Sequence, residues 1–280
     1  MQAPIGIFDS GYGGLTVLKK FIEVLPEYDF VYLGDNARSP YGIRSFETIY
    51  EYTLEAVRYL IDRGCPLIIL ACNTASAKAL KNIQQLILPR IDSSLRVLGV
   101  IRPTAEAIGE TTRTGHVGVF ATKGTVSSES YIMEINKLFP QLKVYQEACP
   151  MWVPLVENNE LDSEGARYFI RRNLDNLMRK SHKIDTVLLG CTHYPLLYPA
   201  IREYLPDHVD IIAQGAIVAL SLEDYLQRHP EIDARCHKEG SVEFLTTGAS
   251  DDFDDRATDF LGYSIQSQRI DKLETKVSAL

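Results

Sequence analysis

The sequence predicts an α/β fold of two pseudo-symmetric domains with mostly parallel sheets and a functional site in the cleft between them. Three observations support this prediction. Short apolar runs alternate with amphipathic stretches along the 280 residues, as they do where crossover helices join parallel strands. Two segments of the first half recur in the second. Small polar residues and cysteines follow several of the apolar runs, at the strand ends where open α/β sheets bind ligands.

Nine apolar runs are predicted strands, in order 5–8, 30–33, 67–71, 97–101, 117–121, 143–147, 186–190, 209–213 and 242–246. The stretches 47–63 and 164–179 between them have helical periodicity. In the first of these, Ser45 is placed to cap the start and Gly64 the end. Its predicted buried face consists of Tyr50, Leu54, Val57 and Ile61.

The internal recurrence involves two pairs of segments. Residues 5–11 resemble 117–123, which lie 112 positions later, and 70–74 resemble 189–193, which lie 119 positions later. Similar offsets predict two related halves. We expect residues 1–101 plus 207–280 to form the first domain and 102–206 the second, because the halves close near Pro103 and Pro206.

Composition narrows the class of protein. Hydrophobic residues make up 45% and charged residues 24%, which excludes a mainly disordered chain. The net charge of −8 and the lack of a basic run disfavour a nucleic-acid partner. Apolar stretches stay below the roughly 18 residues that span a bilayer, and the N-terminus does not resemble a signal peptide. We therefore expect a cytoplasmic protein with no membrane partner.

Two of the five cysteines are candidate catalytic groups. Cys72 and Cys191 each follow an apolar run and precede a helical stretch, so they occupy equivalent places in the two halves. A helix start can lower the pKa of a thiol, and the two thiols would face each other across the cleft. Cys65, Cys149 and Cys236 are interpreted as buried core residues.

Polar residues at the strand ends complete the candidate site. Asp9 and His193 are candidate bases or orienting groups for a thiol. A glycine-rich turn, 11–14, would let the backbone approach a ligand closely. Singly, each of these polar residues has a simpler role as a cap or a core residue, but together they suit the carboxylates of a small acidic ligand. The hydroxyl and amide groups come from Ser10, Asn73, Thr74, Thr122, Thr125 and Thr192.

Three other kinds of site match less well. A dinucleotide fingerprint would need a third glycine where Thr16 stands. Cys191 and His193 could supply two metal ligands, but no C-x-x-C or H-x-x-x-H pattern completes such a site. A phosphatase nucleophile at Asp9 would be followed by a second aspartate at position 11, which is glycine. We expect neither a metal nor a cofactor.

At these residues the chain resembles the cofactor-independent glutamate racemases of bacterial cell-wall synthesis. The resemblance covers nearly the whole chain. Residues 152 and 214–217 depart from it, with tryptophan where phenylalanine is common and QGAI in place of a usually acidic segment. The matching motifs are IFDSGYGGL at 7–15, RSPYG at 38–42, ACNTA at 71–75, CPMWVPLVE at 149–157 and GCTHYP at 190–195.

The resemblance implies roles for individual residues. Cys72 would exchange the α-proton on the D-glutamate side with help from Asp9. Cys191 would do so on the L-glutamate side with help from Glu157 and His193. The residues implied to hold the substrate are Ser10, Pro40, Tyr41, Gly42, Asn73, Thr74, Thr122, Thr125 and Thr192.

The expected activity is therefore the interconversion of L- and D-glutamate, which would supply D-glutamate for peptidoglycan. The expected partner is glutamate itself, and the sequence allows a homodimer. An aspartate racemase or a related two-cysteine isomerase is the nearest alternative. A non-catalytic amino-acid-binding protein of the same fold is a further one, disfavoured because both cysteines and their helpers are present.

Overall fold

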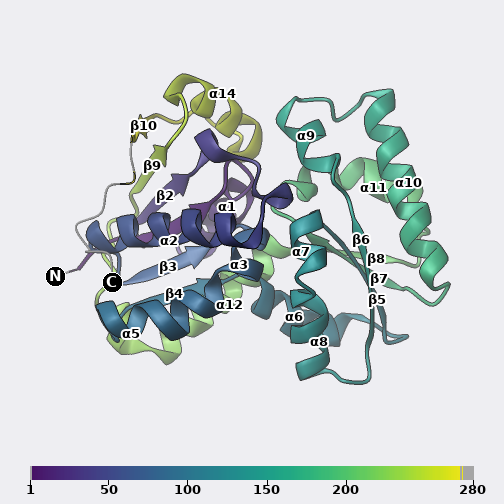
Figure 1. The fold of residues 1–280 in the computed structure, drawn as a ribbon, viewed down its shortest axis with the longest axis horizontal. Helices are drawn as coiled ribbons and strands as arrows, with labels where there is room; N and C mark the ends of the chain where they lie inside the picture. Colours follow the sequence, from purple (N-terminus) through teal and green to yellow (C-terminus); the bar gives the residue numbers. More distant parts are fainter. Residues whose placement is uncertain (1, 272, 274–280) are drawn as a thin grey trace.

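The computed structural model describes residues 2–271 and 273, and the strands within them form two sheets that lie side by side (Figure 1). One sheet has the strand order β10-β9-β2-β1-β3-β4 and the other β6-β5-β7-β8. Every neighbouring pair is parallel. The α/β class with two mostly parallel sheets is confirmed.

The strands are β1 (Ile5–Asp9), β2 (Phe30–Gly34), β3 (Leu67–Leu70), β4 (Arg96–Gly99), β5 (His116–Ala121), β6 (Lys143–Ala148), β7 (Thr186–Gly190), β8 (Asp210–Ala213), β9 (Val242–Thr246) and β10 (Ser267–Arg269). All nine predicted strands are present. The tenth, β10, consists of polar residues and has no apolar signal, and it forms by pairing with β9.

The α-helices are α1 (Leu15–Val24), α2 (Phe46–Asp62), α3 (Asn73–Lys78), α4 (Leu80–Asn82), α5 (Leu88–Ile91), α6 (Ile101–Thr111), α7 (Lys123–Ser127), α8 (Ser130–Leu138), α9 (Trp152–Glu157), α10 (Glu164–Lys180), α11 (Tyr198–Tyr204), α12 (Gln214–Arg228), α13 (Pro230–Asp233) and α14 (Ser250–Leu261). Short 3-10 turns cover Asn36–Arg38, Tyr41–Ile43 and Tyr194–Leu197, and a π-helical turn covers Ile83–Ile87. None of the described helices has the length and apolar character that crossing a bilayer requires.

Helix α2 begins and ends as its caps predict, but only Val57 of the four residues predicted for its buried face is fully buried. Ser45 accepts a hydrogen bond from the backbone N–H of Thr48, and Gly64 has a φ of 89°. Residues Tyr50, Leu54 and Ile61 are only half-buried. The fully buried face is Ile49, Thr53, Ala56, Val57 and Leu60. Thr53 can lie there because its hydroxyl donates to the Ile49 carbonyl at 2.7 Å, which leaves no polar group unpaired.

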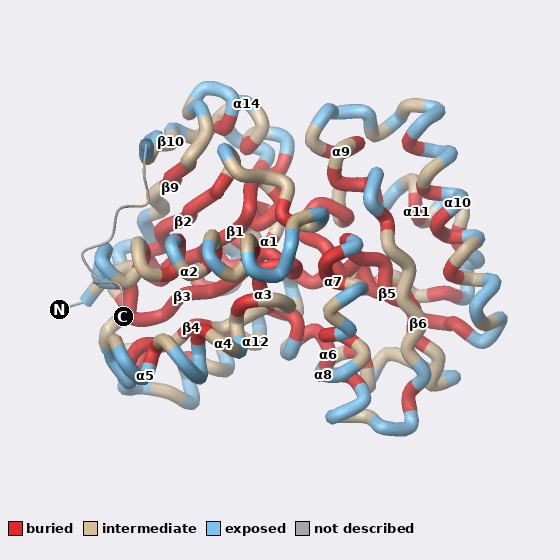
Figure 2. Tube along the Cα trace, in the orientation of Figure 1, coloured by how far each residue is buried: buried red, intermediate tan, exposed pale blue. Residues whose placement is uncertain are grey.

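The recurrence in the sequence corresponds to equivalent places in the two sheets. The order β2-β1-β3-β4 in the first sheet matches β6-β5-β7-β8 in the second. Thus β1 is equivalent to β5 and β3 to β7, which are the pairs that resemble each other in sequence. The central strands β1, β2, β3 and β7 are fully buried, and Figure 2 shows them in red, whereas the edge strands β6 and β10 have no buried residue.

Strand β8 lies in the other sheet from the one that the predicted domain boundary at residue 207 implies. Strand β8 pairs with β7 and so belongs to the second sheet, although 207–280 was assigned to the first domain. The local apolar pattern of β8 does not reveal which sheet it joins, because pairing depends on contacts far along the chain. The chain crosses between the sheets at α6 and again at α12, and α12 packs on both α1 and α6. The domain extents themselves stay a prediction, and 272 and 274–280 lie outside the described residues.

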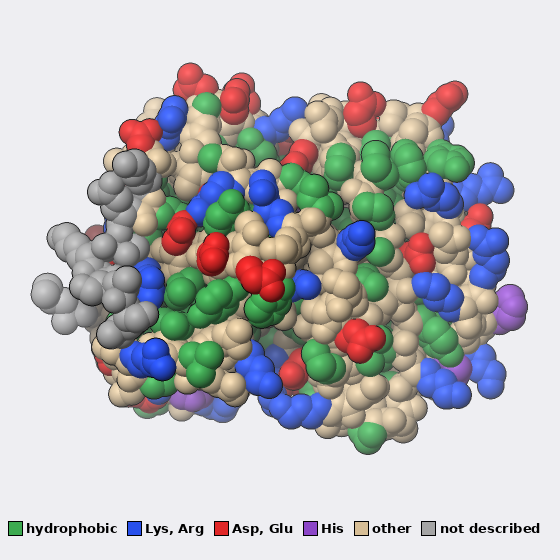
Figure 3. Space-filling model, in the orientation of Figure 1, with side chains coloured by type: hydrophobic (Ala, Val, Ile, Leu, Met, Phe, Trp, Pro, Cys, Tyr) green, Lys and Arg blue, Asp and Glu red, His purple; other side chains and the backbone are tan. Residues whose placement is uncertain are grey.

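The surface carries charges of both signs. On the face shown in Figure 3, Lys and Arg side chains are interspersed with Asp and Glu over both halves of the molecule. This distribution accords with the acidic net charge of −8, which comes without a basic run in the sequence.

Candidate active site

The candidate residues meet where the carboxyl ends of strands from the two sheets face each other. Asp9 is the last residue of β1, and Cys72 follows β3 and directly precedes α3. Thr122 follows β5 and caps α7, while Cys191 follows β7. Since β1 and β3 are equivalent to β5 and β7, the two cysteines occupy matching positions in the two halves.

Cys72 is buried on the first-sheet side of the site. Its side chain is 6% exposed, and Sγ donates to Ser10 Oγ at 3.4 Å. Burial, followed by the nearby Asp9 charge, raises the pKa of Cys72 to about 12. The expected lowering by the helix start is therefore outweighed, because α3 has only six residues and the thiol is removed from water. Without substrate this cysteine is a thiol.

Cys191 lies on the second-sheet side of the site, next to His193, which in turn contacts Glu157. Its Sγ is 4.0 Å from Nδ1 of His193, and Nε2 of His193 is 3.1 Å from Oε1 of Glu157. His193 is buried, whereas the Glu157 side chain is 20% exposed. Burial acts to lower the pKa of His193, but its bonds with Cys191 and Glu157 outweigh burial and raise that pKa to about 10. An imidazolium here places a positive charge beside the Cys191 sulfur.

His193 is expected to stay protonated through neutral pH. Its ring resonances should stay constant between about pH 6 and 8.5, where an exposed histidine titrates. Because its folded pKa is raised, His193 contributes stability below the unfolded pKa of about 6.5, and this contribution is lost as the pH rises through about 10. Glu157→Gln removes one cause of the shift and should move the midpoint down. NMR titration of both proteins measures this, and a midpoint near 6.5 in the unsubstituted protein would refute the assignment.

Asp9 connects the two sides of the site. It is fully buried, its Oδ1 accepts from the backbone N–H of Gly11 at 3.0 Å, and its Oδ2 accepts from Thr192 Oγ1 at 3.5 Å. Burial raises the pKa of Asp9, while the His193 charge acts against that rise. A carboxyl group with a raised pKa beside Cys72 is suited to proton exchange with that thiol.

Three threonine hydroxyls cross between the sheets. Thr74 Oγ1 lies 3.0 Å from Thr122 Oγ1 and 3.4 Å from Thr125 Oγ1. Thr122 also caps α7 by accepting from the backbone N–H of Thr125 at 3.2 Å. Thr122 therefore caps α7 while its hydroxyl also contacts Thr74 across the two sheets.

The loop that holds Pro40, Tyr41 and Gly42 packs against the same threonines. The hydroxyl of Tyr41 donates to Asp35, and Pro40 follows a cis peptide bond. A Cβ on Gly42 would lie 2.8 Å from Cβ of Thr122, so glycine permits the close approach. The structure thus brings this loop to the site, with its tyrosine hydroxyl turned to Asp35.

The glycine-rich turn is pressed against the residues that follow Cys191. A Cβ on Gly13 would lie 2.2 Å from Thr192 Oγ1 and 2.4 Å from His193 Nδ1. Thr16, at the third position of the incomplete dinucleotide fingerprint, donates to the Thr192 carbonyl at 3.0 Å. The turn here contacts protein from the other sheet.

Asn73 belongs to a buried network that includes residues not predicted for the site. Its Nδ2 donates to Gln214 Oε1 at 2.6 Å, and its Oδ1 accepts from the Tyr131 hydroxyl at 2.6 Å. Gln214 directly follows β8, as the other candidates follow their strands. That position was the signal that could have identified it.

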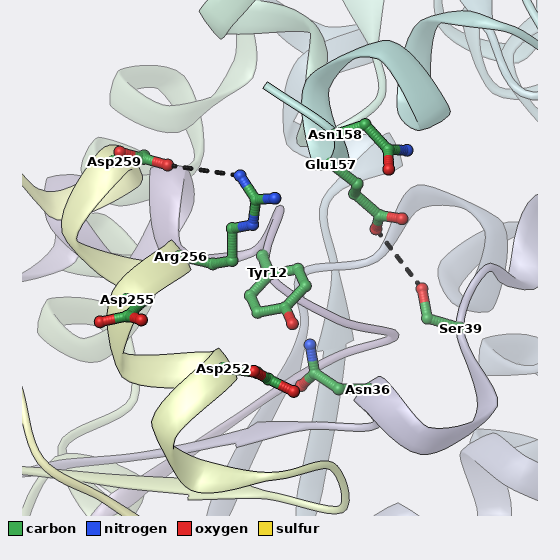
Figure 4. A pocket seen from close by; sticks show the side chains of 9 residues that line it. All are labelled: Tyr12, Asn36, Ser39, Glu157, Asn158, Asp252, Asp255, Arg256 and Asp259. Atoms are coloured by element: carbon green, nitrogen blue, oxygen red, sulfur yellow. Dashed lines mark hydrogen bonds and ion pairs between the residues drawn. The ribbon is translucent and has the colours of Figure 1, made fainter. Parts of the chain in front are cut away.

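A pocket of about 600 Å³ opens between the two halves beside Glu157 (Figure 4). Tyr12, Asn36 and Ser39 border it from the first sheet, and Asp252 and Arg256 come from α14. Ser39 Oγ is 3.5 Å from Glu157 Oε1. Glu157 therefore joins the buried Cys191–His193 pair to this open pocket.

One group of potential metal ligands occurs among the described residues. It consists of Asp29, His237 and Glu239, whose ligand atoms lie within 4.8 Å of one another, and it includes neither Cys72 nor Cys191. Asp29 there accepts backbone N–H bonds from Glu239 and Ser241, a structural role. Within the described part of the chain, Cys191 and His193 belong to no such group.

Comparison with known proteins gives the family. The sequence model of the Asp/Glu/Hydantoin racemase family matches residues 5–220. The chain belongs to this family. It is an amino-acid racemase, an isomerase. A glutamate racemase of Listeria monocytogenes serotype 4b is 41% identical over 261 residues, which cover 93% of this chain and 95% of its relative.

Solved structures of glutamate racemases share the fold of this chain over nearly their whole length. Isoform RacE1 from Bacillus anthracis has a TM-score of 0.87 at 36% identity and covers 96% of this chain and 97% of its own. The Francisella tularensis enzyme, solved in complex with D-glutamate, has a TM-score of 0.86 at 31% identity and covers 98% of each chain. A Picrophilus torridus aspartate racemase shares the fold at 15% identity, with a TM-score of 0.51.

Proposed function

We propose that this racemase interconverts L- and D-glutamate by two-base proton transfer between Cys72 and Cys191. The observation that carries the proposal is the equivalent placement of the two buried cysteines after β3 and β7, each beside its own acid/base helper. Glutamate is proposed as the substrate because relatives of about this chain's length, at 41% and 36% identity, are glutamate racemases. The relative solved with D-glutamate supports the same substrate.

The proton transfer follows from the different surroundings of the two thiols. With L-glutamate bound, the Cys191 thiolate takes the α-proton, and the electrons of the broken Cα–H bond spread into the α-carboxylate. The Cys72 thiol then gives its proton to the opposite face of Cα, which forms the D-enantiomer. Cys191 ends as a thiol and Cys72 as a thiolate, and the reverse reaction runs through the same steps.

The helpers set the resting state for the L-to-D direction. His193, held as an imidazolium by Glu157, stabilises the Cys191 thiolate, while burial keeps Cys72 protonated. In the other direction Asp9 receives or shares the Cys72 proton. The side chains of Ser10, Asn73, Thr74, Thr122, Thr125 and Thr192 are proposed to hold the substrate carboxylates. Since no Schiff base is proposed, these fixed dipoles must stabilise the carbanion-like transition state.

The wider setting is proposed on the family resemblance alone. The D-glutamate product enters peptidoglycan synthesis, the enzyme works in the cytoplasm, and it functions without a cofactor, as a monomer or a homodimer. Light scattering of the purified chain measures the assembly.

Solvent exchange tests the two-base route. In D₂O, the product formed from either enantiomer should carry deuterium at Cα from the earliest time points, because one thiol removes the proton and the other delivers a solvent-derived one. Mass spectrometry of the separated product enantiomer measures this. A product that keeps most of its original α-hydrogen would rule out two-base transfer. D-Aspartate offered in place of D-glutamate tests the alternative substrate, and faster turnover of aspartate would favour it.

Chelation tests the proposed independence from metals. Protein dialysed against a chelator and free of pyridoxal phosphate should racemise glutamate at an unchanged rate. Activity that is lost on chelation and restored by a metal would instead support Cys191 and His193 as ligands.

A further inference from the structure

Asn73, Gln214 and Tyr131 form a closed ring of hydrogen bonds beside Cys72. Asn73 Nδ2 donates to Gln214 Oε1 at 2.6 Å, Gln214 Nε2 donates to the Tyr131 hydroxyl at 2.6 Å, and that hydroxyl donates to Asn73 Oδ1 at 2.6 Å. All three side chains are buried, with exposures of 2%, 3% and 0%. Within the ring each group donates once and accepts once, so the ring has a single direction.

The ring is anchored at both connections between the sheets. Gln214 is the first residue of α12, the second connection, and its Nε2 also donates to Thr104 Oγ1 at 3.0 Å in α6, the first connection. The Thr104 hydroxyl in turn donates to the Val100 carbonyl at 2.7 Å. Both N–H hydrogens of Gln214 are therefore engaged, which fixes the orientation of its amide.

The orientation of Gln214 determines that of Asn73. If the Asn73 carboxamide turned over, its oxygen would face Gln214 Oε1 and its N–H would face the Tyr131 oxygen. The first contact sets two buried acceptors against each other, at a cost of about 1–3 kcal/mol. The ring uses one of the two N–H hydrogens of Asn73.

We propose that Gln214 is a positioning residue for racemisation, which fixes the Asn73 carboxamide so that its second N–H donates to a substrate carboxylate. This inference rests on the proposed function, because Asn73 is the residue through which Gln214 acts. Asn73 directly follows Cys72, so the same orientation sets where the substrate lies relative to that sulfur. Glutamine suits this role and a carboxylate does not, because a carboxylate has no N–H to donate to Tyr131.

Substitution of Gln214 by leucine tests the role through substrate binding. Gln214→Leu keeps the approximate size and removes all three hydrogen bonds of the Gln214 amide. We expect KM for each glutamate enantiomer to rise about tenfold, as when one substrate hydrogen bond is lost, with kcat changed less than about threefold. Gln84→Leu is the control for the same substitution outside the ring; Gln84 Nε2 donates a single bond, to the Val97 carbonyl at 2.7 Å. It should leave KM unchanged.

A double-substitution cycle distinguishes positioning from general stability. In an Asn73→Ala background, Gln214→Leu should raise KM by less than about twofold, because the side chain through which it acts is gone. An equal rise in both backgrounds, or a fall in kcat with no change in KM, would overturn the proposal. Tyr131→Phe breaks the ring at another point and replaces Gln214→Leu if that variant does not fold; it should give the same non-additive rise.

A readout without substrate separates this inference from the proposed function. The side-chain amide signal of Asn73, identified as the one lost in Asn73→Ala, should exchange slowly with solvent in the unsubstituted protein and fast in Gln214→Leu. Equal exchange in both would overturn the positioning role. If the unsubstituted protein fails to turn over glutamate, the proposed function fails, whatever the exchange shows.

Discussion

Cys72→Ser and Cys191→Ser are each expected to lower the rate of racemisation about 1,000-fold or more. A serine hydroxyl is far less acidic than a thiol, so it neither rests as an anion nor delivers a proton at neutral pH. The loss should be similar in both directions, because each turnover uses both groups. Rates of D- to L- and L- to D-glutamate conversion, followed by chiral chromatography, measure the effect.

The thiol that remains in each variant tests which cysteine acts on which enantiomer of glutamate. In D₂O, Cys72→Ser retains Cys191 and should slowly exchange the α-proton of L-glutamate without forming D-glutamate. Cys191→Ser should do the same for D-glutamate. Exchange with the opposite preference would reverse the assignment of sides but keep the two-thiol mechanism.

The remaining cysteines provide matched controls. Cys65 and Cys236 are buried in the hydrophobic cores and have no contact with the candidate site residues among the described interactions. Cys65→Ser and Cys236→Ser should therefore retain most of the activity, with some loss of stability from the buried hydroxyl. Cys149→Ser should do the same, because among residues 2–271 and 273 the Cys149 side chain bonds only to the Glu147 carbonyl. Near-normal turnover by Cys72→Ser or Cys191→Ser would refute the two-thiol mechanism.

Gly13→Ala is expected to reduce activity about 100-fold or more, since a misplacement of about 1 Å can cost that much. The added methyl group would lie 2.2 Å from Thr192 Oγ1 and 2.4 Å from His193 Nδ1, so these two side chains must move. Either movement disturbs the line from Cys191 through His193 to Glu157. The rate of racemisation and the NMR titration of His193 should change together.

Gly165→Ala is the matched control for this substitution. Gly165 is exposed near the start of α10, and an added Cβ there meets only Ser163 Oγ at 3.6 Å, an ordinary contact. The change should leave activity unaltered and stabilise the protein by up to about 1 kcal/mol, because alanine is the better helix former. Full activity in Gly13→Ala would show that the turn can retreat from His193.

Local patterns were enough to predict most of the fold. The apolar runs predicted nine strands because burial on both faces of a parallel strand leaves a continuous apolar signal. Strand β10 gave no such signal, since its polar residues form a strand only once β9 offers an edge to pair with. On α2, three of the four residues predicted to be buried are only half-buried, and the observed buried face includes Thr53, whose hydroxyl is satisfied by its own helix.

The sequence by itself determined which strand ends carry candidate site residues, because a residue that follows a parallel strand must lie at the sheet's carboxyl edge. Cys72, Cys191, Asp9 and His193 were found in this way. Tertiary structure alone decided how these residues behave. Burial beside Asp9 raises the pKa of Cys72, against the expected effect of a helix start. The close approach of the two sheets requires a glycine at position 13. The two helices that connect the sheets, α6 and α12, are joined by the bond from Gln214 to Thr104. Each of these depends on atoms brought together from distant parts of the chain, and desolvation and close contact act only after that packing exists.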